Sequence, residues 1–115
     1  MSAKIHEVSD ALLAELEAKH GARKVLRLTT STPDGAIEVA VLKPGRKEYE
    51  RFRKQLGDEA KRDNALENLL RAHVLAPERA KFDELLDEFP ALPEEFGRPL
   101  LAAMGLSGSA EVGKS

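Results

Sequence analysis

Two β-rich runs joined by a tight turn are the feature that most narrows the folds open to this chain. The first run extends over residues 24–30 and the second over residues 36–43. Between them lies Pro33-Asp34-Gly35, a combination of residues that favours a sharp reversal of the backbone. The sequence therefore predicts a β-hairpin in the first half of the chain.

The second run also predicts which face of this hairpin is covered. Ile37, Val39 and Val41 share one face, whereas Glu38 and Ala40 take the other. A two-stranded ribbon is only marginally stable by itself. We therefore expect helices to pack against the hairpin, or a partner to extend its exposed edge.

The remaining residues predict about five short helices. Ser9 or Asp10 caps the first helix and Gly21 ends it. Apolar spacing and helix breakers predict four more, over residues 46–56, from Asp58 to before Pro77, from Pro77 to Phe89, and from Pro93 to Met104. Their apolar positions are Tyr49, Phe52 and Leu56, then Leu66, Leu69, Leu70, His73 and Val74, then Phe82, Leu85, Leu86 and Phe89, and finally Leu92, Phe96, Leu100 and Met104.

The expected fold class is α+β, mostly helical, with one β-hairpin packed against about five short helices. We expect residues 1–105 to form a single domain, since a chain of 115 residues has the usual size for one core. Residues 106–115 are rich in Gly and Ser, and we expect them to be a disordered tail.

Charge is balanced overall but divided along the chain. Residues 43–62 hold eight basic and four acidic side chains, whereas residues 78–96 hold seven acidic and two basic ones. A protein with two oppositely charged ends suits a role in binding, because complementary charge guides encounter with a partner. The total of 18 basic and 20 acidic residues does not indicate general affinity for nucleic acid or membranes.

Several classes of function are excluded or disfavoured by what the chain lacks. There is no cysteine, which excludes disulfides, thiolate metal ligands and cysteine nucleophiles. No apolar run approaches the roughly 18 residues of a membrane span, and the first ten residues lack the order of a secretory signal. We therefore expect a cytoplasmic protein with no membrane partner.

The most specific motif match lies at the C-terminus and fails on context. Gly108 to Ser115 fits the phosphate-loop pattern G-x-x-x-x-G-K-[ST]. That motif needs a strand before it and a helix after it, so that backbone amides converge on phosphate. No β-rich run precedes Gly108 and no residue follows Ser115 in this sequence. We therefore predict no nucleotide cofactor.

The remaining reactive side chains do not form a recognisable catalytic or metal site. His6, His20 and His73 fall in separate elements and make no i, i+4 pair. We interpret His73 as a partly buried core residue, since it lies on an apolar stripe. We interpret the acidic pairs Asp87-Glu88 and Glu94-Glu95 as residues on solvent-exposed polar faces of their helices. The sequence thus predicts no catalytic residue, no metal, no cofactor and no enzyme activity.

From Val41 to Met104 the order of features resembles the tail assembly chaperones of long-tailed bacteriophages and related phage-derived tail structures. The likeness is carried by four segments, which are Val41-Leu-Lys-Pro-Gly-Arg-Lys-Glu-Tyr-Glu-Arg-Phe, Asn64-Ala-Leu-Glu-Asn-Leu-Leu-Arg-Ala-His-Val, Pro77 with Phe82-Asp-Glu-Leu-Leu-Asp-Glu-Phe-Pro-Ala-Leu-Pro, and Phe96-Gly. In that family a strand leads into an x-Glu-Tyr-x-x-Phe helix, and a second helix, a proline, an acidic helix and a Pro-x-Leu-Pro turn follow.

The resemblance implies a non-enzymatic protein of the infected host's cytoplasm. Such a chaperone binds the tape measure protein and keeps it soluble while tail tube subunits assemble around it, and it is absent from the finished particle. No catalytic residue is carried over. We expect Lys43, Arg46, Arg53 and Lys54 to form the polar rim of the partner-binding surface, with the exposed ribbon edge available for a homo-oligomer.

The resemblance also suggests a second interpretation of the C-terminus. Many tail assembly chaperones are made in two lengths by programmed frameshifting. The segment Val112-Gly113-Lys114 is compatible with a slippery codon run, so the apparent phosphate loop reflects the coding sequence in this hypothesis.

Two other functions stay open at this point. The basic run with Tyr49 and Phe52 is also compatible with a nucleic-acid-binding accessory protein, although these aromatic residues occupy the apolar stripe of their helix. A structural component that remains in a tail particle is the other alternative. Salt-sensitive retention on heparin and the composition of purified particles distinguish these roles from the chaperone.

Overall fold

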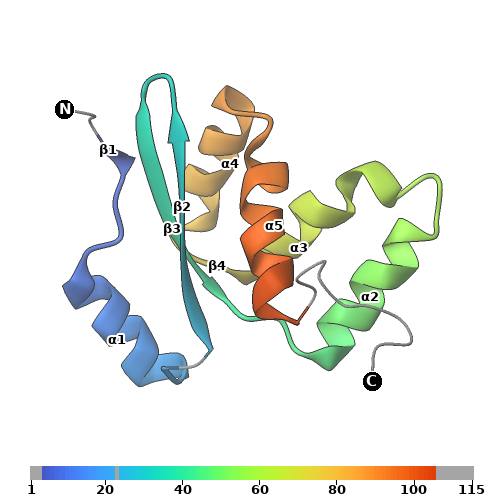
Figure 1. The fold of residues 1–115 in the computed structure, drawn as a ribbon, viewed down its shortest axis with the longest axis horizontal. Coiled ribbons are helices and arrows are strands. Elements are labelled where there is room, and N and C mark those ends of the chain that lie inside the picture. The colour runs from blue at the N-terminus through green and yellow to red at the C-terminus, as the bar shows by residue number, and fades with distance from the viewer. Residues whose placement is uncertain (1–3, 23, 106–115) are drawn as a thin grey trace, which may run out of the picture.

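The computed structural model describes residues 4–22 and 24–105, with the elements arranged as in Figure 1. The strands are β1 (Lys4–His6), β2 (Val25–Thr32), β3 (Gly35–Leu42) and β4 (Val74–Ala76). The helices are α1 (Asp10–His20), α2 (Arg46–Leu56), α3 (Ala65–His73), α4 (Arg79–Glu88) and α5 (Leu92–Ala103), with a 3-10 turn η1 (Arg62–Asn64) before α3. The predicted tail, the phosphate-loop pattern and the possible frameshift site all lie outside the described residues.

The predicted hairpin is confirmed. Strands β2 and β3 pair antiparallel from Val25 opposite Leu42 to Thr32 opposite Gly35, which leaves a two-residue turn. The Thr32 hydroxyl closes this turn, because its Oγ1 donates to the Gly35 carbonyl at 2.8 Å and accepts from the Asp34 amide at 3.1 Å. Gly35 has a φ of 143°, a conformation that glycine adopts far more readily than other residues.

The sheet is larger than the predicted hairpin, because two short strands cover the other edge of β3. Strand β1 pairs parallel with the beginning of β3, at Ala36 and Ile37. Strand β4 pairs antiparallel with its end, at Ala40 and Val41. The sequence predicts a helix through Val74, and this is wrong. The helix ends at His73, and the next residues extend along an edge of β3 that would otherwise lack hydrogen-bonding partners.

The first two helices have the predicted ends. Ser9 caps α1, with its Oγ accepting from the Leu12 amide at 3.1 Å, and Gly21 follows the helix with a φ of 102°. Helix α2 spans residues 46–56 as predicted, and Gly57 is its C-cap. Helix α5 ends at Ala103, before Gly105, and carries Pro93 in its first turn.

Two helix starts differ from the prediction. Asp58 does not cap a long helix, because its Oδ1 accepts from the Ala60 amide at 2.9 Å and closes a turn instead. Helix α3 therefore begins only at Ala65, after η1. Helix α4 begins at Arg79 rather than at Pro77, since Glu78 keeps an extended backbone and occupies the N-cap.

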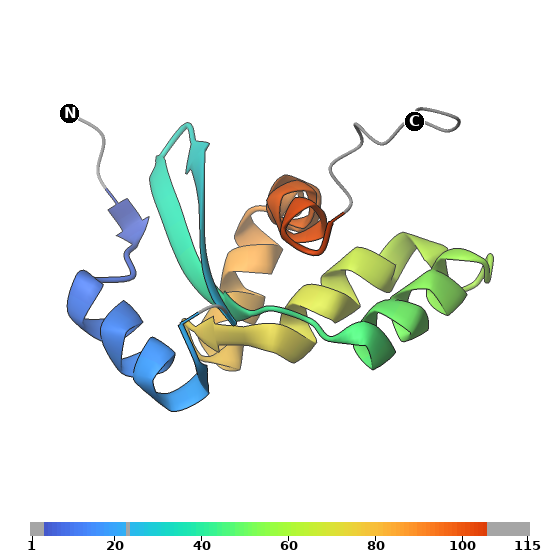
Figure 2. The same ribbon diagram turned by 60° about the horizontal axis from the view of Figure 1, so that its bottom comes forward.

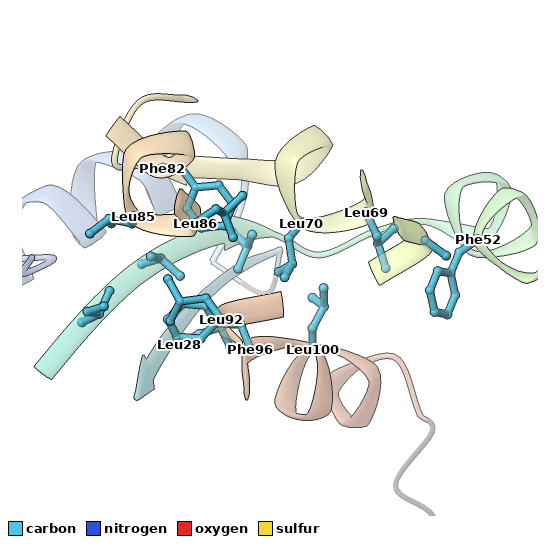
Figure 3. Packing of buried hydrophobic residues seen from close by; sticks show 14 residues of the cluster. Leu28, Phe52, Leu69, Leu70, Phe82, Leu85, Leu86, Leu92, Phe96 and Leu100 are labelled. Atoms are coloured by element: carbon cyan, nitrogen blue, oxygen red, sulfur yellow. The ribbon is translucent and has the colours of Figure 1, made fainter. Parts of the chain in front are cut away.

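The main core lies on one face of the sheet and between the last four helices. Ile37, Val39 and Val41 project from β3 into this core with at most 1% of their surface exposed, so their predicted shared face is confirmed. Figure 3 shows α4 residues entering from one side and α5 residues from the other, with α3 residues between them. The helical members are Phe52, Ala65, Leu69, Leu70, Phe82, Leu85, Leu86, Leu92, Phe96 and Leu100.

Helices α3 and α5 come into unusually close contact. A Cβ atom on Gly97 would lie only 2.7 Å from Cγ of Leu66, closer than real Cβ atoms approach such a neighbour. The glycine is therefore required by packing, not by an unusual backbone angle. Its absence of a side chain lets the α3 surface rest directly on α5.

The opposite face of the sheet carries a smaller cluster beneath α1. Val8, Val25, Ala40 and Ala76 are buried there, and α1 leucines pack against them without being fully buried. A salt bridge of 2.8 Å between Arg27 and Asp10 ties the sheet to the first turn of α1. The hydrogen bond to Asp10 raises the pKa of Arg27 above its ordinary value.

Candidate functional site

The histidines are dispersed and serve local structure. His6 Nδ1 donates to the Glu38 carbonyl at 2.7 Å, and His73 Nδ1 donates to the Leu69 carbonyl at 2.8 Å. His20 is the last residue of α1. Within residues 4–22 and 24–105, no group of three or more His, Asp or Glu side chains is arranged to hold a metal ion.

The concave surface best suited to a partner lies between α2 and α3. These helices form an arm that extends away from the sheet, as Figure 2 shows. Between them is a groove of about 240 Å³. Its apolar floor consists of Phe52, Ala65, Leu69 and Ala72. Phe52, Ala65 and Leu69 are buried, whereas Ala72 is exposed at the edge of the floor, and the walls are exposed or half-buried. The groove therefore has the amphipathic character of a site for an apolar side chain.

Polar side chains line the walls of this groove. Glu48, Arg51 and Gln55 come from α2, whereas Asn68 and His73 come from α3. The Asn68 side-chain amide donates to Gln55 Oε1 at 3.5 Å, so the two walls meet above the floor. Because this contact is exposed and long, an incoming side chain can replace it at little energetic cost.

The groove continues toward the outer end of the arm. A second depression of about 300 Å³ shares Arg51 and Gln55 with the first and adds Lys54, Asp58 and Lys61. Three cations and one carboxylate therefore surround this end. We call the two depressions together the arm groove. It offers an apolar centre with a cationic outer end, which favours a partner whose flank is acidic.

The structure does not unite the four predicted rim residues. Lys54 borders the arm groove, and it also lines a shallow depression with Arg53 and Glu50 on the outward face of α2. Lys43 and Arg46 line a separate depression beside Met104. Of the four residues, only Lys54 therefore borders the arm groove. Helical periodicity turns Arg46 and Arg53 away from α3, and Lys43 precedes α2.

Sequence reasoning missed most of the polar residues that do border the groove. Arg51, Gln55, Asn68 and Lys61 were not singled out, although all four are exposed or half-buried there. A usable signal exists in α2, where Arg51 and Gln55 flank the buried Phe52 at i, i+4 spacing. Which side chains of α3 border the groove could not be predicted in the same way, since this depends on how α2 and α3 pack against each other.

A second cavity lies where the β2–β3 turn meets the α4–α5 turn. It has a volume of about 350 Å³ and combines Pro33, Phe89 and Leu92 with the carboxylates of Glu88 and Glu95. Thr30, Ser31 and Thr32 complete its β2 side. We call it the acidic cleft. Figure 1 places these two turns and the α2–α3 loop at different ends of the molecule.

The fold and the two surfaces define a small α+β protein with candidate binding sites, and comparison with known proteins places it in a family. Residues 16–113 match the family described as Domain of unknown function (DUF6848), and the chain belongs to that family. No curated protein matches the chain. No helix within the described ranges is long and apolar enough to cross a membrane.

A solved structure shares the fold. The structure titled as that of the uncharacterised protein rbstp2171 from Bacillus stearothermophilus matches with a TM-score of 0.71 and 21% sequence identity. The match covers 86% of this chain and 97% of the other. At this identity the likeness concerns the fold alone.

Proposed function

We propose that this protein is a tail assembly chaperone, which binds the tape measure protein and keeps it soluble during assembly of a phage-type tail. In this proposal it acts in the host cytoplasm, has no enzymatic activity, and releases its partner as tail tube subunits assemble. The observation that carries the proposal is the arm groove, an apolar surface that is concave, accessible and bordered by charge.

The shape of the groove fits one apolar ridge of an amphipathic helix. Helix-in-groove recognition uses apolar anchors at i, i+3 and i+4, and such anchors need a floor like Phe52 and Leu69. A tape measure protein is long and helical, so it presents many such ridges that would aggregate if left exposed. The cations at the outer end favour ridges with acidic neighbours.

The resemblance from Val41 to Met104 supports the same function. That segment begins within β3 and includes α2, α3, α4 and α5, so it contains both walls of the arm groove. The x-Glu-Tyr-x-x-Phe part corresponds to α2, where Phe52 provides the floor. The part of the chain that resembles the chaperones is thus the part that builds the candidate site.

The test is co-expression with a long helical tape measure protein, the partner that this proposal names. We expect the partner to stay soluble and to co-purify with the wild-type chain. In the variant Ala72→Trp, a bulky side chain would occupy the groove from an exposed position of α3. We expect this variant to lose most of the co-purified partner.

A matched variant controls for the effect of a surface tryptophan. Ala80 is also exposed on a helix, but it lines none of the cavities described above. Ala80→Trp should retain the partner at the wild-type level. Failure of the wild-type chain to retain or solubilise the partner would contradict the function, whereas equal retention by both variants would contradict the groove as its site.

An accessory role in nucleic-acid binding is supported by one observation. Helix α2 exposes five cations, which are Arg46, Lys47, Arg51, Arg53 and Lys54. Phosphate contacts by such a helix would make retention on heparin strongly dependent on salt. Elution at low salt, at the position of a protein of similar net charge, would remove this alternative. If the protein were found in purified tail particles, this would instead indicate that it is a structural component.

A further inference from the structure

The outer end of the arm carries an exposed apolar side chain. Leu56 has 42% of its surface exposed, and no other large hydrophobic residue in the described part of the chain is classed as exposed. It continues the stripe of Tyr49 and Phe52 by one turn, but the core ends before it. Leu56 lines neither part of the arm groove. A separate role is therefore compatible with an occupied groove.

Cations flank this leucine. Arg53 precedes it by one helical turn, where i and i+3 side chains are neighbours. Arg62 Nε donates to the Leu56 carbonyl at 2.8 Å, which holds the second guanidinium beside the same turn. The end of the arm is therefore an apolar knob between two guanidinium groups, with Asp58 as the nearest carboxylate along the chain.

The acidic cleft has the complementary character. Phe89, Leu92 and Pro33 provide apolar lining, and Glu88 and Glu95 provide negative charge. Its volume of about 350 Å³ lies within the range of pockets that bury most of the surface of what they bind. The knob and the cleft thus match in both polarity and charge.

We propose that the protein self-associates head to tail, with Leu56 of one copy inserted into the acidic cleft of the next. Leu56 ends α2, whereas the β2–β3 and α4–α5 turns line the cleft, and Figure 1 places these elements at different ends of the molecule, so one contact leaves a free knob and a free cleft. Such a heterologous contact continues into a row of copies or closes into a ring. This inference does not depend on the proposed function, because it uses neither the groove nor a partner protein.

Sedimentation velocity of the full chain tests the association. We expect the weight-average mass to increase with protein concentration at about 50 mM NaCl and to fall at about 500 mM NaCl, because salt screens exposed charges. A protein that remains monomeric up to about 1 mM at low salt would overturn the proposal, since that limit allows only affinities weaker than about 1 mM.

Two variants remove the two halves of the contact. Leu56→Asp destroys the knob, and Glu88→Lys with Glu95→Lys reverses the cleft. Each variant alone should associate at least about tenfold more weakly than the wild type, a factor that corresponds to 1.4 kcal/mol. Glu15→Lys is the matched charge reversal on an exposed position of α1, away from both surfaces, and it should associate like the wild type.

Mixing the variants gives the decisive result. The Leu56→Asp copy keeps its cleft and the double lysine copy keeps its knob, so an equimolar mixture should form a dimer that cannot grow further. Association of either variant at the wild-type strength, or a mixture without dimers, would overturn the proposal. Circular dichroism of each variant checks that the fold is retained.

Discussion

The two faces of the sheet are covered very differently. On one face, β2 and β3 contribute Leu28, Ile37, Val39 and Val41 to a cluster completed by ten buried residues of α2 to α5. On the other face, four small or branched residues are buried beneath a helix that has no fully buried residue of its own. The difference indicates that α3, α4 and α5 hold the fold, whereas α1 is an attachment that can open locally at lower cost.

The largest expected effect is at the centre of the main core, on the sheet face covered by α2 to α5. Phe96 is completely buried between α5 and the sheet, so Phe96→Ala should lower the free energy of unfolding by about 3–5 kcal/mol through lost burial and a residual cavity. Urea denaturation followed by circular dichroism measures this loss. A loss near that of an exposed residue would contradict the assignment of this face as the main core.

The contact between α3 and α5 should also be sensitive to added volume. Gly97→Ala introduces a Cβ against Leu66 and should cost about 1–3 kcal/mol. Combining it with Leu66→Ala should recover part of this loss in a double-mutant cycle. The control is Gly57→Ala, where the nearest atom to a new Cβ is 3.6 Å away. Equal losses in the two glycine variants would refute the close-approach explanation.

The sheet face covered by α1 should tolerate the truncation of a side chain better. Leu12 on α1 is half-buried, so Leu12→Ala should cost only about 1 kcal/mol, in proportion to its smaller buried area. Native-state hydrogen exchange measures the difference directly, and α1 amides should exchange at a lower opening free energy than those of β3. Equal protection of the two elements would show that α1 opens only with the whole fold.

The smallest effect is expected at the surface between α3 and α4. Arg71 donates to both carboxylate oxygens of Asp83, at 2.8 and 3.3 Å, yet each side chain is about 40% exposed. Asp83→Asn should therefore change the free energy of unfolding by no more than about 1 kcal/mol. The difference from the wild type should shrink further in high salt, as measured by thermal unfolding. A larger, salt-independent loss would mean that this pair is part of the core packing.

The elements that sequence reasoning predicted well are those specified by neighbouring residues. The hairpin depends on a turn and on an alternating strand, and both lie within residues 24–43. Strands β1 and β4 are only three residues long, which is too short for a period to be visible. They become strands because β3 offers them an edge, and this information is absent from their own residues.

The candidate site was harder to predict for a similar reason. Treating residues 43–62 as one basic surface ignores the helical rotation of α2, which directs Arg46 and Arg53 away from the wall that Arg51 and Gln55 provide. The other wall comes from α3, and its position follows from core packing by Leu69 and Leu70. Charge counts along the chain therefore pointed to α2, which provides one wall of the candidate groove, but not to most of the side chains that border the groove.

The sharing of one β3 edge by β1 and β4 bears on the order in which the chain folds. The β2–β3 hairpin closes over a few residues, whereas His6 bonds to a residue 32 positions away and β4 is synthesised long after β3. Loop closure costs more for the distant pairings, so we expect the hairpin to form first and β4 to dock last. During synthesis, the apolar face of that hairpin therefore stays exposed until α3, α4 and α5 have been made and pack against it. The newly made chain is most prone to aggregation in that interval.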